Sequence, residues 1–259
     1  MNKIHPTAII ESGAEIHDSV EVGPYSIIES DVILGEGCRI ESGVRIFSGT
    51  RMGRRNRVCH GATLGCEPHD LDFTPERSRP LVIGDDNLFK EGVNISRGVK
   101  TAEGTVVGNG NYFMSGFHAG HDCRLGNHNV YGSNSVLAGH VEMGDHIFLS
   151  GVAAVHQFCF VGDYAMIAGC AKVVKDIPPY TTGDGNPARI IGLNSIGLRR
   201  AGMTAGVRSA IKRAYRVIYQ SELNTSQALE QLKGEQQIEE VERIIRFFEQ
   251  SSRGVTDHR

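Results

Sequence analysis

The chain carries an aliphatic residue or methionine at every sixth position over its first quarter. Stepping by six, the residues are Ile4, Ile10, Ile16, Val22, Ile28, Leu34, Ile40, Ile46, Met52, Val58 and Leu64. At 40% hydrophobic content, an unbroken run of this length arises by chance with a probability of roughly four in a hundred thousand. The residue four positions later is mostly small, and glycine often follows the aliphatic residue.

A six-residue period excludes a run of helices and indicates stacked short strands. A helix repeats every 3.6 residues and soon falls out of phase with six. Hexapeptide repeats are the signature of a parallel β-helix, and its coils stack about 4.8 Å apart. We expect the aliphatic residues to fill a prism of three strands per coil. The small positions, which include Cys38, Cys123 and Cys159, belong to its core.

Two interruptions and a change of pattern divide the chain. The repeat breaks at "CEPHDLDFTPERSRP" and near "KTAEGT", which predicts protruding loops near residues 66–80 and 98–106. It ends near Val173, and residues with helical spacing follow, such as Ile211, Ala214 and Ile218. The sequence therefore predicts a mainly β protein, with a β-helix over residues 1–191 and a small α-helical C-terminal domain over residues 192–259.

Composition narrows the setting in which the protein works. The net charge of −3 argues against nucleic acid as a partner. No apolar stretch approaches the roughly 18 residues of a membrane span, and the start "MNKIHPTAII" lacks the pattern of a signal peptide. The six cysteines are scattered without a CxxC pair, which favours reduced and mostly buried thiols. We therefore expect a cytoplasmic protein without a membrane span.

The six-residue register brings several histidines to one side of the prism. His121, His140 and His156 fall in repeats that differ by three, and three repeats make one coil. They should therefore lie in successive coils, with His118 at the same edge. By the same register, Cys123 points inward, whereas His121 and Asp122 should lie on the outer face.

Three interpretations of this histidine strip remain open. Histidines suit exposed edges, so the strip could be fortuitous. Imidazoles also bind zinc, but the inward Cys123 and Cys159 leave few further ligands. The third interpretation is a catalytic and binding strip, since a histidine titrates near pH 7 and suits the role of a base. Asp122 could then orient the ring of His121.

Several motifs of this chain resemble those of the UDP-N-acetylglucosamine O-acyltransferase family. They are "HPTAII", "FHAGHDCRLGNHNVYGSNSVLAGHV", "AVHQFC", "DIPPY", "GLNSIGLRRAG", "IKRAYRVIYQS" and "SSRGV". The resemblance covers nearly the whole chain. It implies a left-handed β-helix with a helical C-terminal domain, assembled as a homotrimer with active sites between subunits. It also implies transfer of a 3-hydroxyacyl chain from acyl carrier protein to the sugar 3-hydroxyl of UDP-N-acetylglucosamine, the first step of lipid A synthesis, without cofactor or metal.

The resemblance also assigns roles to individual residues. His121 matches the catalytic base, Asp122 stands beside it, and Gly139 matches the backbone amide that supports the thioester oxyanion. Gly169 matches the position that sets acyl-chain length. The residues that match substrate contacts are Asp70, His118, His140, His156, Gln157, Asn194 and Arg200.

Some positions depart from the family pattern, mostly on the acceptor side. Asp72 stands where the family usually has a lysine, Ser96 replaces a histidine, and Ala201 replaces an arginine. Two alternatives therefore remain: a paralogous acyltransferase that acts on a different nucleotide sugar, and a non-catalytic trimeric protein that binds sugar nucleotides. A metal-dependent hexapeptide enzyme is a further, weaker one. Residues 199–216 include six basic and no acidic residues, a pattern that suits phosphates or an acidic carrier protein.

Overall fold

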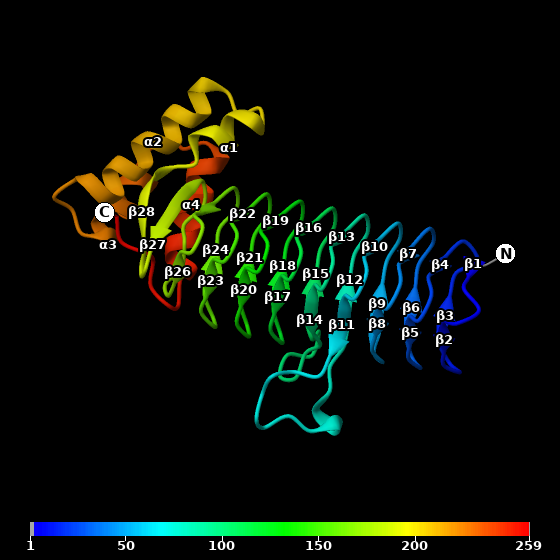
Figure 1. The fold of residues 1–259 in the computed structure, drawn as a ribbon. Helices are drawn as coiled ribbons and strands as arrows, with labels where there is room; N and C mark the ends of the chain where they lie inside the picture. The colour runs from blue at the N-terminus through cyan, green and yellow to red at the C-terminus, as the bar shows by residue number, and fades with distance from the viewer. Residues whose placement is uncertain (1–2, 259) are drawn as a thin grey trace.

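Short strands follow one another along the chain and stack into three sheets that form the walls of a prism (Figure 1). The computed structural model describes residues 3–258. The first sheet contains β1 (Lys3–Ile4), β4 (Glu21–Val22), β7 (Arg39–Ile40), β10 (Arg57–Val58), β13 (Leu88–Phe89), β16 (Tyr112–Phe113), β19 (Val130–Tyr131), β22 (Phe148–Leu149), β25 (Met166–Ile167), β27 (Thr181–Gly185) and β28 (Ala188–Leu193).

The two other walls have the same construction. The second sheet contains β2 (Ile9–Ile10), β5 (Ile27–Ile28), β8 (Arg45–Ile46), β11 (Thr63–Cys66), β14 (Asn94–Ser96), β17 (His118–Ala119), β20 (Val136–Leu137), β23 (Ala154–Val155) and β26 (Lys172–Val173). The third contains β3 (Glu15–Ile16), β6 (Ile33–Leu34), β9 (Thr50–Met52), β12 (Leu81–Ile83), β15 (Thr105–Val107), β18 (Arg124–Leu125), β21 (Glu142–Met143) and β24 (Phe160–Val161).

The strand register confirms the coil length that the sequence predicts. Lys3 pairs with Glu21, which stands three hexads later in the chain, and the paired strands of the prism are parallel. The last pair, β27 with β28, is antiparallel. The predicted fold class, a left-handed parallel β-helix followed by α-helices, is confirmed.

Two insertions leave the regular coils, and beside them the register of β11 with β14 shifts between Leu64 and Cys66. Arg57 pairs with Leu88, much further along the chain than one regular coil, so the first insertion enlarges this coil. Leu88 pairs with Tyr112, again further than one regular coil, so the second insertion enlarges the next. The first loop, residues 67–80, includes the 3-10 helix η1 (Pro75–Arg77) and projects from the prism (Figure 1). The second, residues 97–104, lies between β14 and β15.

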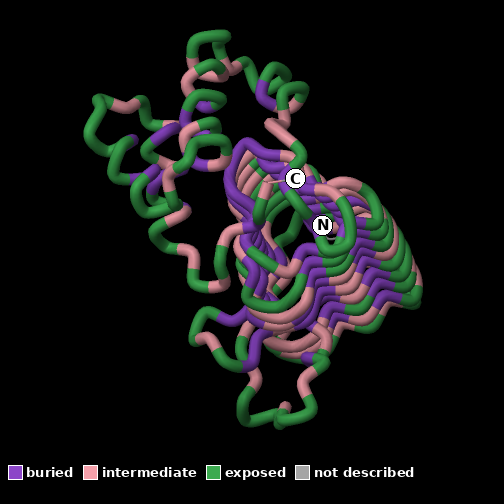
Figure 2. The backbone as a smooth tube through the Cα atoms, turned by 90° about the vertical axis from the view of Figure 1, so that its left-hand side faces the viewer, coloured by how far each residue is buried: buried purple, intermediate pink, exposed green. Residues whose placement is uncertain are grey.

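The aliphatic repeat fills the prism, as the period predicts. Its members are buried from Val22 onward, and Figure 2 shows the buried positions recurring from coil to coil. Phe113 stacks on Phe89 at 4.8 Å and on Tyr131 at 4.7 Å between ring centroids. Phe117 packs against Tyr131 at 4.7 Å.

The cysteines behave as the sequence predicts. All six are free, and Cys38, Cys59, Cys123 and Cys159 are buried. The Cys123 thiol donates a hydrogen bond to the carbonyl oxygen of Ala138 at 3.2 Å. Burial raises the pKa of this thiol to about 12, so Cys123 is a protonated core residue.

The helices lie at the C-terminal end of the prism (Figure 1). They are α1 (Ser195–Arg200), α2 (Ala205–Gln220), α3 (Thr225–Lys233) and α4 (Glu239–Gln250). The buried face of α2 includes the predicted Ile211, Ala214 and Ile218. Arg243 of α4 pairs with Asp163 of the prism at 2.6 Å. No helix within residues 3–258 is long and apolar enough to cross a membrane.

The last residues return from α4 to the end of the prism. The backbone N–H of Asp176 donates to the carbonyl of Gly254 at 2.9 Å, and the N–H of Thr256 donates to the carbonyl of Asp176 at 2.8 Å. The hydroxyl of Ser251 donates to a carboxylate oxygen of Asp176 at 2.6 Å. The tail is therefore held by the prism at several points.

Candidate active site

The turn after β17 holds His121 and Asp122 in a hydrogen-bonded pair. Nδ1 of His121 lies 2.8 Å from Oδ2 of Asp122. An ionised carboxylate can only accept, so Nδ1 carries the hydrogen and Nε2 keeps a lone pair. The His121 side chain is 13% exposed and that of Asp122 is fully covered. The pair thus presents one ring nitrogen that can accept a proton.

The expectation that Asp122 lies on the outer face is wrong. The second loop folds over this residue, and the backbone N–H groups of Val99, Lys100 and Thr101 all point at its carboxylate, within 3.2 Å. The Thr101 hydroxyl adds a hydrogen bond of 2.7 Å. The repeat predicts an outward turn but carries no information about an inserted loop that covers it.

These hydrogen bonds keep Asp122 ionised in spite of its burial. Burial by itself raises the pKa of this carboxyl, but the hydrogen bonds from His121 and from the loop residues Thr101 and Lys100 more than offset it. The net result is a pKa well below the usual range. A permanent carboxylate fixes both the orientation and the tautomer of the His121 ring.

Gly139 faces the reactive edge of His121 from the next coil. A β-carbon placed on Gly139 lies 2.8 Å from Nε2 of His121, so the two groups are neighbours. Within residues 3–258, the N–H of Gly139 has no hydrogen-bond acceptor. A proton acceptor and an unpaired backbone donor therefore lie side by side.

His140 extends this arrangement along the prism. Its ring lies 5.1 Å from that of His121 and stacks on Phe158 at 4.7 Å. Nε2 of His140 lies 3.8 Å from Oδ2 of Asp122 and is buried without a hydrogen-bond partner among the described residues. Burial lowers the pKa of His140, and the Asp122 carboxylate opposes this shift.

His118 lies in β17, directly before the turn that holds His121, and its Nδ1 is also engaged. Nδ1 is 2.7 Å from Oδ1 of Asn94, whose amide nitrogen donates to Thr63 at 2.6 Å. Nδ1 of His118 is therefore the donor. The ring stacks on His69 of the first loop at 5.3 Å. Burial, followed by the neighbouring His69, lowers the pKa of His118.

His156 and Gln157 follow β23 and are exposed. The successive turns after β17, β20 and β23 carry His121, His140 and His156 on one edge of the prism, as the register predicts. Nδ1 of His156 lies 3.0 Å from Nη2 of Arg253 in the C-terminal tail. We call the set His118, His121, His140 and His156 the histidine strip.

Asp70 reaches the histidine strip from the first loop. Its Oδ2 pairs with Lys100 at 3.1 Å, which joins the two loops. Its Oδ1 accepts the backbone N–H of Asp72 at 3.0 Å. The N–H of Asp72 and then Lys100 lower the pKa of Asp70, and the nearby His121 adds to the effect.

His121, Asp122 and His140 also form a grouping of metal-ligand types. One ligand atom from each lies within 4.8 Å of the others. The Asp122 carboxylate, however, already accepts hydrogen bonds from His121 and from the second loop. A metal ion would have to displace several of these, so the geometry fits a hydrogen-bonded pair better than a metal centre.

The remaining predicted positions lie beyond this strip. Asn194 caps α1: its side chain accepts from the N–H of Gly197 at 3.0 Å and donates to the carbonyl of Tyr164 at 2.9 Å. Arg200 is exposed in the last turn of α1, and Ala201 is its C-cap. Gly169 is exposed, and a β-carbon there would meet Gly151 at an ordinary 3.5 Å.

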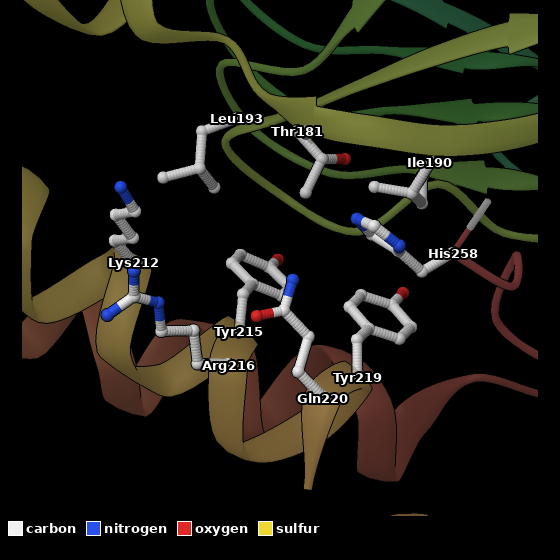
Figure 3. A pocket seen from close by; sticks show the side chains of 10 residues that line it. Thr181, Ile190, Leu193, Lys212, Tyr215, Arg216, Tyr219, Gln220 and His258 are labelled. Carbon is white, nitrogen blue, oxygen red and sulfur yellow. The ribbon is translucent and has the colours of Figure 1, made fainter.

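A separate cavity of about 180 Å³ opens between α2 and the β27–β28 hairpin (Figure 3). Tyr215 and Tyr219 rise into it from α2, with Lys212 and Arg216 on one side. It shares no residue with the histidine strip. The cavity is therefore a different site from the one that contains His121.

Comparison with known proteins gives the family. The model described as UDP-N-acetylglucosamine O-acyltransferase, domain 2, matches residues 176–256, and that of the bacterial transferase hexapeptide matches residues 13–48. The acyl-[acyl-carrier-protein]–UDP-N-acetylglucosamine O-acyltransferase of Myxococcus xanthus is 43% identical over 99% of this chain and 100% of its own. The chain belongs to the UDP-N-acetylglucosamine O-acyltransferase family. The Paraburkholderia phymatum enzyme of the same name is 40% identical over 98% of this chain and 99% of its own.

Solved structures of the family superpose on nearly the whole of this chain. The Francisella novicida UDP-N-acetylglucosamine acyltransferase superposes with a TM-score of 0.96 at 34% identity, covering 98% of this chain and 94% of its own. The Bacteroides fragilis enzyme gives 0.93 at 39% identity, covering 97% and 98%. The resemblance inferred from the motifs is thereby confirmed.

The departures from the family pattern have distinct surroundings. Asp72 is exposed, and its carbonyl accepts a hydrogen bond from Arg77 at 2.8 Å. Ser96 is fully buried, with its hydroxyl 3.7 Å from the thiol of Cys66. Of the two, Asp72 is therefore the one whose side chain is open to solvent.

Three contacts of the histidine strip and one contact of the nearby Asp70 escape sequence reasoning. Asn94 holds His118, Lys100 holds Asp70, Phe158 stacks on His140, and Arg253 contacts His156. Phe158 stands one regular coil after His140, so the coil period is a usable signal for it. Nothing in the repeat points to Lys100 or Arg253, because both lie outside the regular coils.

Proposed function

We propose that the protein transfers a 3-hydroxyacyl chain from acyl carrier protein to the 3-hydroxyl of UDP-N-acetylglucosamine, with His121 as general base. The observation that carries the proposal is the alignment of Asp122, His121 and Gly139. The carboxylate fixes Nδ1 as a donor, and Nε2 lies 2.8 Å from the position that a β-carbon on Gly139 would occupy. Family membership supports the same reaction, since relatives carry its name.

The reaction proceeds by attack of the sugar hydroxyl on the thioester. The hydroxyl oxygen forms a bond to the carbonyl carbon while its proton passes to Nε2 of His121. The tetrahedral intermediate then collapses and breaks the carbon–sulfur bond. The proton on Nε2 passes to the departing thiolate, which leaves His121 neutral again.

Gly139 acts on the thioester carbonyl of the acyl donor. As the carbonyl carbon becomes tetrahedral, its oxygen acquires negative charge. The unpaired N–H of Gly139 donates to that oxygen, and a preorganised donor of this kind typically contributes about 10²- to 10³-fold in rate. The imidazolium that forms at His121 is stabilised by the Asp122 carboxylate.

The other members of the histidine strip bind substrate together with Asp70 and Gln157. In this proposal Asp70, His118, His140, His156 and Gln157 contact the donor or the acceptor around His121. Asn194 and Arg200 act on the nucleotide side, and Gly169 sets the acyl length. The basic residues of α2, which is free of acidic residues, suit an acidic carrier protein.

The same proposal includes assembly as a homotrimer and a cytoplasmic location. It also divides the chain into a β-helix domain that ends at residue 191 and a helical domain that begins at residue 192. Several large apolar side chains on the coils of the histidine strip are exposed. Val152 is 60% exposed, Phe158 51% and Val136 40%. Apolar patches of this kind favour contact with another subunit, and a neighbouring subunit would complete the substrate groove.

The experiment is a product analysis with purified protein. Acyl carrier proteins loaded with 3-hydroxyacyl chains of several lengths are incubated with a panel of nucleotide sugars, and products are identified by mass. The proposal predicts acylated UDP-N-acetylglucosamine as the main product. Acylation of another nucleotide sugar only would favour the paralogue suggested by Asp72. Binding without any product would favour a sugar-nucleotide-binding protein.

A further inference from the structure

Arg253 contacts His156 although the two residues are 97 positions apart in the chain. Nη2 of Arg253 lies 3.0 Å from Nδ1 of His156. The Nε–H of the same guanidinium donates to the carbonyl of Val174 at 3.0 Å. Two sides of the guanidinium are therefore engaged, one by the prism backbone and one by the imidazole.

The backbone around Arg253 is anchored on both sides. Asp176 of the prism accepts from the Ser251 hydroxyl at 2.6 Å and from the N–H of Thr256 at 2.8 Å. It also donates to the carbonyl of Gly254 at 2.9 Å. The guanidinium is thus presented to His156 by a tail segment with a defined position.

This contact determines the tautomer of His156. A guanidinium has only donors and stays protonated in proteins, so Nδ1 of His156 must accept and cannot carry a hydrogen. Nδ1 also lies 3.3 Å from the carbonyl oxygen of Gln157, and a hydrogen bond there would need a hydrogen on Nδ1. The shorter contact with a permanent donor decides between the two, so the neutral ring carries its hydrogen on Nε2.

His156 therefore has the opposite tautomer to two other members of the strip, His118 and His121. His118 and His121 donate from Nδ1, to Asn94 and Asp122 respectively, and offer a lone pair at Nε2. His156 is exposed and offers an N–H instead. One edge of the prism thus presents both acceptors and a donor.

We propose that Arg253 is a positioning residue that holds His156 in the Nε2–H tautomer, so that His156 donates a hydrogen bond to a substrate oxygen. The oxygen belongs to a carbonyl, hydroxyl or phosphate of the ligand that binds along the strip. The proposal rests on the proposed function, in which His156 contacts substrate. It adds a residue of the C-terminal tail to the substrate groove.

The tautomer can be measured without substrate or turnover. Protein labelled with ¹⁵N-histidine gives ring nitrogen resonances, and the His156→Gln variant assigns those of His156. We expect an unprotonated Nδ1 and a protonated Nε2 in the wild type, with exchange between both tautomers in Arg253→Met. A wild-type His156 with its hydrogen on Nδ1 would overturn the proposal, whether or not the protein transfers acyl chains.

Kinetics then test whether the tautomer matters for binding. We expect Arg253→Met to raise the KM for one substrate about tenfold, a loss of about 1.4 kcal/mol, with kcat within about twofold. Arg253→Gln, whose amide can donate to Nδ1, recovers most of the loss. Arg253→Met adds nothing in a His156→Gln background, because residues acting through one group are non-additive.

Controls separate this role from a structural one. Arg246→Met removes an arginine of α4 that pairs with Glu239 on the surface and leaves KM unchanged. If Arg253→Met does not fold, Arg253→Gln and Arg253→Lys carry the test. Additive losses in the double variant, or equal losses in Arg253→Gln and Arg253→Met, would contradict the proposal.

Discussion

Gly139 and His121 fit together only because Gly139 has no side chain. A β-carbon at residue 139 would lie 2.8 Å from Nε2 and 3.0 Å from Cε1 of the ring, well inside normal contact distance. The ring of His121, held at its other edge by Asp122, would have to move. Adding a side chain at residue 139 therefore tests whether the reaction depends on the position of the His121 ring.

We expect Gly139→Ala to lower kcat/KM about 100-fold while the protein stays folded, because a displacement of about 1 Å at a reacting group has an effect of this size. Steady-state rates and circular dichroism measure the two properties. Gly234→Ala is the matched control, since Gly234 has helical φ at the end of α3 and a β-carbon there meets its neighbours only at ordinary contact distance. Equal rates for both variants would contradict this role of Gly139.

Asp122→Asn is expected to lower kcat about 10²- to 10⁴-fold, with little change in KM, because the ring of His121 loses the carboxylate that fixes its tautomer. The variant also loosens the second loop. Hydrogen exchange at the amides of Val99, Lys100 and Thr101 should therefore accelerate. Unchanged exchange at these amides would show that they do not depend on the carboxylate.

The stability contributed by Asp122 should depend on pH in a defined window. Its pKa in the folded protein lies below the ordinary value of 3.8, so its contribution is present above that value and is lost as pH falls through the folded pKa. Urea unfolding of the wild type and Asp122→Asn measures this from pH 7 to pH 3. The wild type should be more stable at pH 7, and the difference should narrow below about pH 4. A constant difference would contradict the account.

Lys100→Met should weaken binding of the nucleotide sugar. Lys100 holds Asp70, whose side chain is 13% exposed, at 3.1 Å, and without it the two loops lose an ion pair that is shorter than the one between Arg97 and Glu67 at 3.7 Å. We expect the KM for the sugar nucleotide to rise about tenfold and the free energy of unfolding to change by less than about 1 kcal/mol. Lys233→Met, which removes the exposed ion pairs of Lys233 with Glu230 and Glu249, is the control and should leave KM unchanged.

Phe113→Ala should destabilise the prism by about 3–5 kcal/mol, because the ring is fully buried between Phe89 and Tyr131 and its loss leaves a cavity. Chemical denaturation measures the change. Tyr25→Ala, at a side chain that is 74% exposed, should change stability by about 0.5 kcal/mol or less. A similar loss in both variants would contradict the assignment of the core.

The sequence predicts the prism well because its period is shared by many residues. Each coil requires an aliphatic residue at the equivalent interior position, as at Val22, Ile40 and Val58. One atypical residue therefore does not obscure the period. The turns are less predictable. Val152 has a φ of 58°, a conformation that glycine favours and β-branched residues rarely adopt, and only its place in the coil imposes it.

The sequence predicts the positions of those site residues that lie on regular coils, but not of those that lie in an insertion or in the C-terminal tail. The repeat alone brings His121, His140 and His156 to one edge. It cannot show that residues 97–104 cover Asp122, because an insertion has no register with the repeat. It also cannot show that Arg253 returns to His156, since the path of the tail depends on how the helices pack.

The most direct test of the account is the rate of acyl transfer by His121→Ala beside His60→Ala. His60 is an exposed histidine of the prism, in the turn between β10 and β11, with its ring 3.0 Å from the hydroxyl of Ser42. With 3-hydroxyacyl carrier protein and UDP-N-acetylglucosamine, we predict that His121→Ala loses at least about 10²-fold in kcat and still binds both substrates, whereas His60→Ala retains the wild-type rate. Transfer by His121→Ala at the wild-type rate would contradict the assignment of His121 as the general base.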